Sequence, residues 1–397
     1  MVKGEIKLER PERFSGAYTI KKEKLEEAAK AACEKLRRLA EKYGAQAFPG
    51  TCSKDYAYIC DINKNWECGM YTGCYWLAYL LTGDEFFRKV AEEQTVTYKR
   101  RIDEKIGMDD HDVGFVFTPS CVAEYKITGN KVAKDYALAA CEYFYEHSYS
   151  KEGKFIIRSW KSWDKGSGCR TMMDSLMNAP LLFWAALQTD RKEYFDAAIN
   201  HVKTTEQYLI REDGSSYHHY QFDPATAGPV RGVTLQGLSD ESTWSRGHSW
   251  GIYGFPIAYS YSKEPSLIQL HKNITYYMLN KLPEDLIPHW DYDLSSTDAP
   301  RDSSAGACAV CGMLEMARLS PDDAEQRSVF ESAAAQILES IIDNCTGDIG
   351  RDYDGLICHV THAFPQGQGI DECAVYGDFF YLEALARYIL PDFKKFW

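Results

Sequence analysis

Long apolar runs are missing from this chain, and no segment approaches the roughly 18 consecutive apolar residues that a membrane span requires. The first residues, MVKGEIKLERPERF, bring no apolar stretch of signal-peptide length behind their charges. Pro, Gly and Ser do not gather into a linker or a low-complexity stretch, so we expect residues 1–397 to form a single domain. These absences predict a protein that stays in the cytoplasm and spans no membrane.

An excess of positive charge is also absent. The chain has 45 Lys and Arg residues against 58 Asp and Glu residues, which gives a formal net charge of −13 at pH 7. Nucleic acids and anionic membranes bind to basic faces that release counterions, so neither is an expected partner. A short anionic ligand remains compatible with this charge if a few cations in a pocket hold it.

The pattern of cysteines and acidic residues indicates neither disulfides nor metals. The thirteen cysteines are an odd number scattered over a long chain, which predicts free thiols. Cys308 and Cys311 form a lone CxxC in an Ala- and Gly-rich run, and no second Cys pair or His pair stands at zinc spacing. Asp109, Asp110 and Asp112 lie in a predicted turn, not along one helix face, without a second acidic motif. We therefore expect no metal and no cofactor.

Six apolar, small-residue-rich helical runs recur along the chain, each directly after a Trp or Asp in a polar turn. A helix that is apolar all round needs cover on every side, whereas an amphipathic helix needs cover on one face. The alternation of the two kinds predicts an all-α fold, an (α/α)6 barrel whose six hairpins place inner helices inside a ring of outer ones. The inner runs open at Trp66, Asp112, Asp174, Trp244, Asp302 and Asp371. The amphipathic segments are residues 21–43, 84–102, 130–149, 192–210, 266–279 and 324–343.

The segments between these helices predict where a site would form. The openings of the inner runs are unevenly spaced, which excludes a tightly periodic solenoid. Residues 154–160 (KFIIRSW) and 214–224 (GSSYHHYQFDP) are rich in aromatic and β-branched residues beside Gly, which predicts short β-hairpins. If the six units form a ring, the residues that precede the inner helices meet at one mouth, and the hairpins lie in the loops there.

Asp112 and Asp174 are the first candidates for chemistry, because each precedes an inner helix in polar company, MDDHDVGF and CRTMMDSLMN. Asp is also a preferred N-cap residue, so a structural role is the alternative for both. Asp302 and Asp371 precede inner helices in the same way, and we interpret them as caps or as residues that orient a neighbour.

Two adjacent histidines, His218 and His219, lie in an aromatic stretch. Adjacent residues of an extended strand face opposite ways, so we expect that the two do not bind one ligand together. One of them facing a pocket, as a donor or a charge partner, and a structural histidine with its bonds satisfied are both open at this point.

The densest group of polar and aromatic side chains falls within VRGVTLQGLSDESTWSRGHSWGIYG. Indole faces stack on pyranose rings, and amide and guanidinium groups bind hydroxyls and carboxylates, so this mixture is typical of sugar sites. Trp184 and Trp250 lie inside helical runs, where packing is the alternative. The members of the group are Gln236, Trp244, Arg246, His248 and Trp250, and aromatic surface near other loops comes from Trp66, Trp160, Trp163 and Trp290.

Six strings in this sequence resemble the unsaturated glucuronyl hydrolases, glycoside hydrolase family 88. They are HDVGF, MDSLMNAPLLFWA, FDPATAGPVRGVTLQG, TWSRGHSWGIYG, PRDSSA and DECAVYGDFFYLEAL, and they follow one another in the family's order. The resemblance covers nearly the whole chain from about Trp66 onward. It implies a six-hairpin α/α barrel with the site at one mouth, in agreement with the pattern of helices.

By this resemblance, the substrate is a lyase-generated oligosaccharide of the glycosaminoglycan type with a 4,5-unsaturated glucuronic acid at its non-reducing end. Asp174 matches the family's general acid/base, and Asp112 matches the second essential aspartate, which binds ring hydroxyls. The residues expected to contact the substrate are Trp66, His111, Trp160, His218, Gln236, Trp244, Arg246 and Trp250.

The implied reaction is hydration of a vinyl ether, which differs from attack at the anomeric carbon. Asp174 would donate a proton to C4 and then accept one from the water that attacks C5; the resulting hemiketal opens and expels the rest of the sugar chain. To act as an acid near neutral pH, Asp174 needs a raised pKa, and Asp112 is a natural source of the negative charge that raises it. Arg246 either clamps the substrate carboxylate or lines the entrance.

One departure from the family's pattern bears on the substrate. Members that favour sulfated fragments have Ser-x-x-Ser-x-Lys shortly before the last inner helix, where this chain has Ala363, Gln366 and Gln368. Unsulfated chondroitin, hyaluronan or other unsaturated glucuronyl ends are therefore equally good candidates. The alternatives are an unsaturated rhamnogalacturonyl hydrolase acting on pectin fragments and, from another class, a catalytically silent sugar-binding barrel or helical scaffold. The paired HDVGF and MDSLMN strings favour the glucuronyl family.

Overall fold

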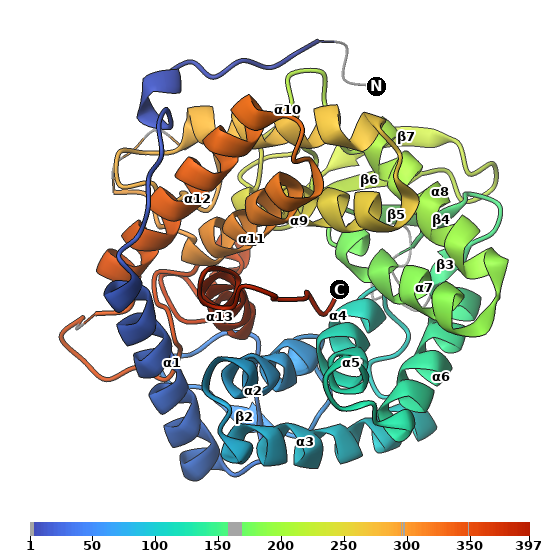
Figure 1. The fold of residues 1–397 in the computed structure, drawn as a ribbon. Helices are drawn as coiled ribbons and strands as arrows, with labels where there is room; N and C mark the ends of the chain where they lie inside the picture. Colours follow the sequence, from blue (N-terminus) through green and yellow to red (C-terminus); the bar gives the residue numbers. More distant parts are fainter. Residues whose placement is uncertain (1–3, 158–168, 295, 297, 348) are drawn as a thin grey trace.

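The helices form two concentric rings (Figure 1) in the computed structural model, which describes residues 4–157, 169–294, 296, 298–347 and 349–397. The amphipathic segments become the outer ring because each has a single apolar face to bury. In α1, for example, Leu25, Ala29 and Leu36 are buried, whereas Glu26 and Lys30 are exposed. The outer helices are α1 (Lys22–Tyr43), α3 (Glu85–Asp103), α6 (Lys131–Ser148), α8 (Lys192–Tyr208), α10 (Ser266–Lys281) and α12 (Ala324–Cys345).

The apolar runs become the inner ring, as predicted. Four of these runs begin within a residue of the Asp or Trp at which we placed their opening, because that residue is the N-cap. Asp371 instead lies in the loop before α13, whose N-cap is Ala374. The inner helices are α2 (Cys68–Thr82), α7 (Ser175–Thr189), α9 (Ser245–Ser262), α11 (Ser303–Leu319), α13 (Val375–Ile389) and a composite of α4 (Val113–Phe117), the π-helical turn η2 (Thr118–Val122) and α5 (Ala123–Thr128). The predicted barrel is confirmed.

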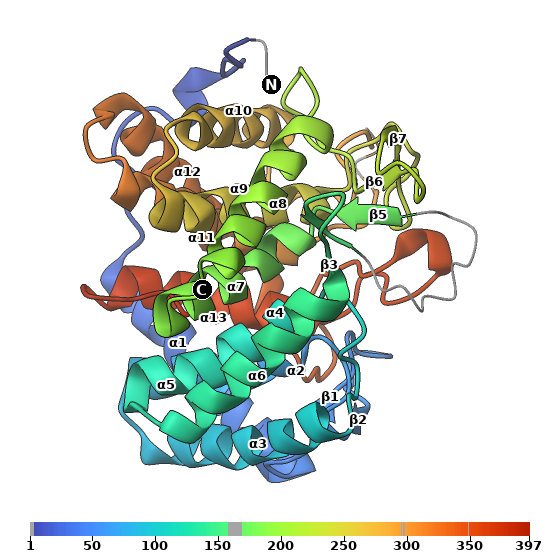
Figure 2. The same ribbon diagram turned by 90° about the vertical axis from the view of Figure 1, so that its right-hand side faces the viewer.

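The two ends of the barrel differ in their connections. Each inner helix except α13, the last helix of the chain, passes to the next outer helix through a short turn, such as Gly83 and Asp84 between α2 and α3. The connections into the inner helices are long, and the three small antiparallel sheets lie in them, at one end of the barrel in Figure 2. The sheets are β1 (Phe48–Pro49) with β2 (Cys60–Asp61), β3 (Tyr149–Ser150) with β4 (Phe155–Ile156), and β5 (Cys169–Met172) with β6 (His219–Phe222) and β7 (Pro229–Val233). This end, which also holds the N-termini of the inner helices, is called the mouth below.

Glycines bring neighbouring inner helices into close contact all the way round the ring, with main-chain atoms at three of the contacts and with side-chain atoms at the other three. A Cβ atom added to each of six glycines would lie between 2.1 and 3.2 Å from an atom of the next inner helix, so a side chain at these positions would force the helices apart. The six contacts are Gly69 (α2) with Val116 (α4), Gly114 (α4) with Asn178 (α7), Gly254 (α9) with Leu176 (α7), Gly312 (α11) with Ile252 (α9), Gly377 (α13) with Ser304 (α11), and Gly73 (α2) with Phe379 (α13). This is why the inner runs are rich in small residues.

The end of the chain lies in the centre of the ring (Figure 1). Trp397 is buried there, and its ring lies 6.0 Å from that of Phe115 and 6.4 Å from that of Phe380 between centroids. All thirteen cysteines belong to the described residues and all are free thiols, Cys308 and Cys311 being fully buried, as the spacing predicted. Among the described helices, none has the length and apolar character needed to cross a membrane.

Candidate active site

Asp112 and Asp174 lie at the mouth as the N-cap residues of α4 and α7, and neither side chain caps its own helix. Aspartates and asparagine at the starts of outer helices behave differently: Asp84 accepts a hydrogen bond from the Phe86 amide, and Asn130 accepts one from the Val132 amide. An aspartate that occupies a cap position without capping has its carboxylate directed elsewhere. The purely structural alternative is therefore not what the geometry shows for these two residues.

Asn178, one turn into α7, links the two aspartates. Its side-chain amide nitrogen lies 3.4 Å from Oδ1 of Asp112 and 3.1 Å from the main-chain oxygen of Asp174, and it donates to both. Its Oδ1 accepts a hydrogen bond of 2.7 Å from the amide of Phe115 in α4. Asp112 and Asp174, which are separated by 62 positions in the sequence, are thus linked by the side chain of a single residue, Asn178.

His111 lies beside both aspartates rather than in the open mouth. It is 4% exposed; its Nδ1 pairs with Asp110, and its Nε2 lies 3.2 Å from Oδ1 of Asp112. Burial alone would lower its pKa, but the carboxylates of Asp112 and Asp110, with Asp174 beyond them, raise the pKa of His111 to about 9. The imidazole is therefore a cation at neutral pH that compensates the negative charge of the site.

Removing this cation gives a testable dependence of stability on pH. The pKa of His111 is raised above its unfolded value of about 6.5, so its stabilising contribution is complete below that pH and is lost as the pH rises through about 9. We expect His111→Gln to have a lower melting temperature than the wild type below about pH 6.5, and the difference to narrow toward pH 9 and above. Thermal unfolding across this range checks it, with exposed His147→Gln as control; a difference that stays constant with pH would contradict it.

Asp110, His111 and Asp112 also form a cluster with ligand-type atoms within 4.8 Å of one another. Both ring nitrogens of His111 already face carboxylates, Nδ1 toward Asp110 and Nε2 toward Asp112. A protonated imidazole has no lone pair to give to a metal ion. The cluster therefore fits an internal ion pair better than a metal site.

His218 lies next to Asp174, with its Nε2 3.8 Å from Oδ2 of the aspartate. The amides of Leu235 and Gln236 both point at its Nδ1, at 3.3 and 3.4 Å, so Nδ1 is an acceptor and Nε2 carries the proton that faces Asp174. The alternation of a strand, on which we based the expectation that His218 and His219 do not bind one ligand together, does not hold here, because their ring centroids are 3.8 Å apart. The reason is that His218 lies in a bend before β6, where the alternation of a strand does not yet hold.

Arg246 is buried at 2% exposure, and its guanidinium makes three hydrogen bonds within the protein. Its guanidinium donates to Oδ2 of Asp302 at 2.6 Å, to the main-chain oxygen of Thr361 at 2.7 Å and to that of His362 at 2.5 Å. Gln236 donates to the same His362 oxygen at 2.9 Å. Arg246 and Gln236 therefore hold the loop that leads to α13 against the mouth, a role that neither the clamp nor the entrance interpretation of Arg246 foresaw.

Some of the candidate tryptophans lie beside the other candidate site residues, and one packs inside the barrel. Trp66 is half-buried and stacks on Tyr376 at 5.5 Å, and Trp244 lies 4.3 Å from the ring of His218, so both stand beside the candidate residues. Trp250 is 1% exposed and packs against Phe115 and Phe380 within the barrel, in agreement with the packing alternative. Trp160 and Trp163 lie outside the described residues.

Two residues at the site were not identified from the sequence. Asn178 contacts both aspartates, and the signal for it was its position four residues after Asp174, on the same face of α7. Tyr376 stacks on Trp66, and the guanidinium of Arg246 lies 4.6 Å from its ring centroid. Tyr376 lies in DECAVYGD, the string used for the family resemblance, but tyrosine is common in the inner helices and gave no separate signal.

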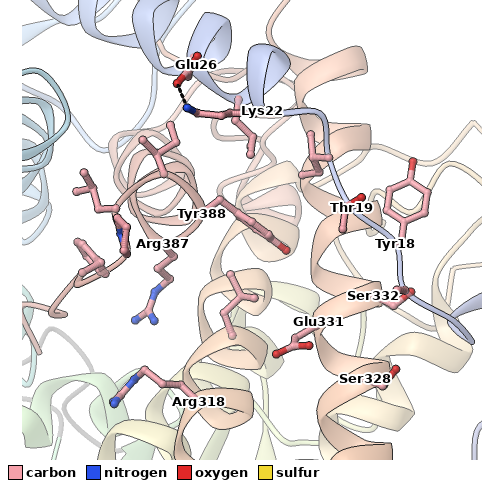
Figure 3. A pocket seen from close by; sticks show the side chains of 18 residues that line it. Tyr18, Thr19, Lys22, Glu26, Arg318, Ser328, Glu331, Ser332, Arg387 and Tyr388 are labelled. Atoms are coloured by element: carbon pink, nitrogen blue, oxygen red, sulfur yellow. Dashed lines mark ion pairs between the residues drawn. The ribbon is translucent and has the colours of Figure 1, made fainter.

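A cavity of about 750 Å³ elsewhere on the barrel, shown in Figure 3, lies away from these residues. It is lined by residues before and in α1, by α12 and by the C-terminal parts of α11 and α13. Its charged side chains are already paired, Lys22 with Glu26 and Arg318 with Glu315. Because it adjoins the ends of inner helices opposite the mouth, it is separate from the site of Asp112 and Asp174.

Comparison with known proteins agrees with this geometry. The sequence model of Glycosyl Hydrolase Family 88 matches residues 45–342. The chain belongs to glycoside hydrolase family 88. The predicted enzyme class, an unsaturated glucuronyl hydrolase, is thereby confirmed, and the family's α/α barrel is the fold described above.

Several relatives of this family 88 chain resemble it over nearly their whole length. An unsaturated chondroitin disaccharide hydrolase of Streptococcus pyogenes serotype M1 is 37% identical, over 98% of this chain and 97% of its own. An unsaturated glucuronyl hydrolase of Bacillus sp. strain GL1 is 33% identical, over 88% and 93%. The crystal structure of the unsaturated glucuronyl hydrolase from Streptococcus agalactiae superimposes with a TM-score of 0.93 at 35% identity, covering 99% of each chain. An aspartate-to-asparagine variant of that enzyme has been solved in complex with dGlcA-GalNAc6S.

Proposed function

We propose that this enzyme removes 4,5-unsaturated glucuronic acid from the non-reducing end of unsaturated chondroitin disaccharides, by hydration of the C4=C5 bond. The observation that carries the proposal is the pair of non-capping aspartates, Asp112 and Asp174, joined through Asn178 at the mouth. The names of the Streptococcus relatives, unsaturated chondroitin disaccharide hydrolases, support the choice of substrate.

In the proposed mechanism, Asp174 acts first as an acid and then as a base. Its protonated carboxyl gives a proton to C4, which leaves positive charge shared between C5 and the ring oxygen. The carboxylate then accepts a proton from the water that attacks C5. The hemiketal that forms at C5 opens and releases the second sugar, so Asp174 ends the cycle protonated. Asp112 binds the ring hydroxyls, and Nε2–H of His218, directed at Asp174, orients its carboxylate.

Two features of the mouth support an anionic substrate in a protein of negative net charge. The inner helices direct their N-termini, where unpaired amides and the helix dipole give partial positive charge, toward the mouth. His111, a cation beside Asp112, offsets part of the negative charge of the Asp110 and Asp112 carboxylates that would otherwise repel the substrate. Half-buried Trp66, which stacks on Tyr376, offers an aromatic face for a sugar ring, whereas Trp244 is 3% exposed and supports the ring of His218.

The loop before α13 supports a preference for unsulfated substrate. Ala363 lacks a hydroxyl, and the side-chain amide of Gln366 donates to the main-chain oxygen of Leu235 at 2.7 Å. Gln368 is a neutral amide at the position where the family's sulfate-binding pattern has a lysine. We expect kcat/KM for the unsulfated chondroitin disaccharide to equal or exceed that for the 6-sulfated one. Loss of the ultraviolet absorbance of the conjugated double bond measures both.

A matched variant sharpens this comparison. Gln368→Lys introduces a cation at the exposed loop position, and we expect it to raise the preference for the 6-sulfated disaccharide roughly tenfold, equivalent to about 1.4 kcal/mol. A wild-type enzyme that prefers the sulfated disaccharide would contradict the assignment of this loop. Turnover of an unsaturated rhamnogalacturonyl disaccharide but of neither chondroitin disaccharide would replace the proposed function by the pectin alternative.

We further propose that residues 1–397 act as one catalytic domain in a reducing compartment, the cytoplasm. The support is that all thirteen cysteines are free thiols, most of them buried. Secreted proteins, by contrast, tend to join their cysteines in disulfide bonds.

A further inference from the structure

We propose that Asn178 is a positioning residue that sets the separation of Asp112 and Asp174; this inference rests on the proposed function. The two aspartates belong to different helices, and the amide of Asn178 bonds to a group of each, Oδ1 of Asp112 at 3.4 Å and the main-chain oxygen of Asp174 at 3.1 Å. The reaction requires both acids to meet one sugar ring, so the side chain that fixes their distance controls the rate.

The acceptor half of the same amide fixes the opposing helix. Oδ1 of Asn178 receives the amide of Phe115, the third residue after Asp112, at 2.7 Å. This amide belongs to the first turn of α4, where main-chain N–H groups have no partner within the helix. Asn178 therefore caps α4 from the side, a task that Asp112 would perform if its carboxylate were not directed elsewhere.

Gly114 makes this arrangement possible. A Cβ atom at Gly114 would lie 2.4 Å from Cα and 2.5 Å from the main-chain oxygen of Asn178, so α4 and α7 touch at the level of their backbones. At this distance a short amide reaches both aspartate-bearing segments, and a longer side chain has no room. The glycine and the asparagine thus act together as a spacer of fixed length between the two acids.

A requirement of packing alone does not explain an asparagine here. Asn178 is 0% exposed, and burying an amide is unfavourable unless its hydrogen bonds are made, whereas an apolar residue of similar size would pack without that cost. All three of its bonds go to the turns that carry Asp112 and Asp174. The polar side chain is retained where it orients groups of the site.

The test compares Asn178→Ala and Asn178→Asp with the same changes at Asn273. Asn273 is also buried, and its side chain both accepts and donates hydrogen bonds. Its Oδ1 accepts one from the amide of Ile6 at 3.0 Å, and its Nδ2 donates one to the main-chain oxygen of Gly4 at 2.9 Å. It lies in outer helix α10, away from the aspartates. For each variant, kcat and KM are measured on the unsulfated unsaturated chondroitin disaccharide, and thermal unfolding is recorded.

We expect kcat of Asn178→Ala to fall about 100-fold, the effect of a misplacement near 1 Å, with a smaller rise in KM. Asn178→Asp keeps the size and the acceptor for Phe115 but loses the donated bonds, so it should lower kcat at least as much. The Asn273 variants should lose thermal stability and keep kcat at temperatures where they are folded. Gly114→Ala, which pushes α4 from α7, should lower kcat more than Gly312→Ala, which strains α9 against α11.

Either of two results would overturn the proposal: wild-type kcat in folded Asn178→Asp, or equal falls in kcat for the Asn178 and Asn273 variants. If Asn178→Ala does not fold, Asn178→Asp and Gly114→Ala decide the question. A wild-type enzyme that does not turn over the disaccharide counts against the proposed function instead. The two failures are therefore distinguishable.

Discussion

Asp174→Asn should abolish nearly all turnover while leaving substrate binding in place. An amide cannot donate a proton to C4 or accept one from water, and loss of a general acid/base commonly lowers rates by about 10² to 10⁴-fold. We expect kcat to fall by at least about 10³-fold, with the dissociation constant for the unsaturated disaccharide within about tenfold of the wild type. Single-turnover absorbance measurements and calorimetric titration give the two quantities separately.

A matched control uses another aspartate at an N-cap. Asp323 begins outer helix α12 and accepts a hydrogen bond from the Gln326 amide at 3.0 Å, so its role is that of a cap. Asparagine caps helices nearly as well as aspartate, and Asp323→Asn should leave kcat and stability close to the wild type. An Asp174→Asn enzyme with substantial turnover would remove Asp174 from the mechanism.

The second large effect concerns the buried ion pair of Arg246 and Asp302. Burial raises the pKa of Asp302, and the guanidinium of Arg246 opposes this, so removing the cation leaves an uncompensated buried carboxylate. We expect Arg246→Leu to lower the free energy of unfolding by about 3 to 5 kcal/mol. It should also raise KM, because the loop at Thr361 and His362 loses its donors. Chemical denaturation and steady-state kinetics measure the two effects.

Removing both partners separates the two roles of Arg246. In the double variant Arg246→Leu, Asp302→Leu no buried charge is left unpaired, so most of the lost stability should return, while the loop remains without the hydrogen bonds of the guanidinium. We expect stability to recover and KM to stay raised. A wild-type KM in the double variant would show that Arg246 does not hold the loop, and a KM raised with full stability in Arg246→Leu would favour a direct clamp on the substrate.

The helices were predictable from the sequence because each kind has a distinct pattern of apolar residues. Residues 175–189 are apolar on all faces, which predicts an inner helix. Residues 22–43 have one apolar face, which predicts an outer helix that covers the inner ring. The two aspartates were predictable because they precede inner helices, and such residues meet wherever a ring closes. None of these inferences needed the conformation of a side chain.

The contacts within the site required the structure. Arg246 was expected to face the substrate, and its engagement with Asp302 depends on a partner 56 positions away along the chain. The orientation of His218 depends on a bend before β6 that no residue pattern marks. Asn178 was overlooked because an asparagine inside a helical run has no typical role. Its role depends on a hydrogen bond from the amide of Phe115 in the neighbouring helix α4, which the sequence does not show.

The closed circle of glycine contacts has a consequence for how such an enzyme can change its substrate. A Cβ atom at any of these six glycines would lie within 3.2 Å of an atom of the next inner helix, so the width of the inner ring resists change at these positions. Diversification is then confined to the rim, where long connections tolerate replacement without disturbing the diameter below. The long loops at the mouth are therefore the part of this barrel most open to change, while the ring of inner helices beneath them stays as it is.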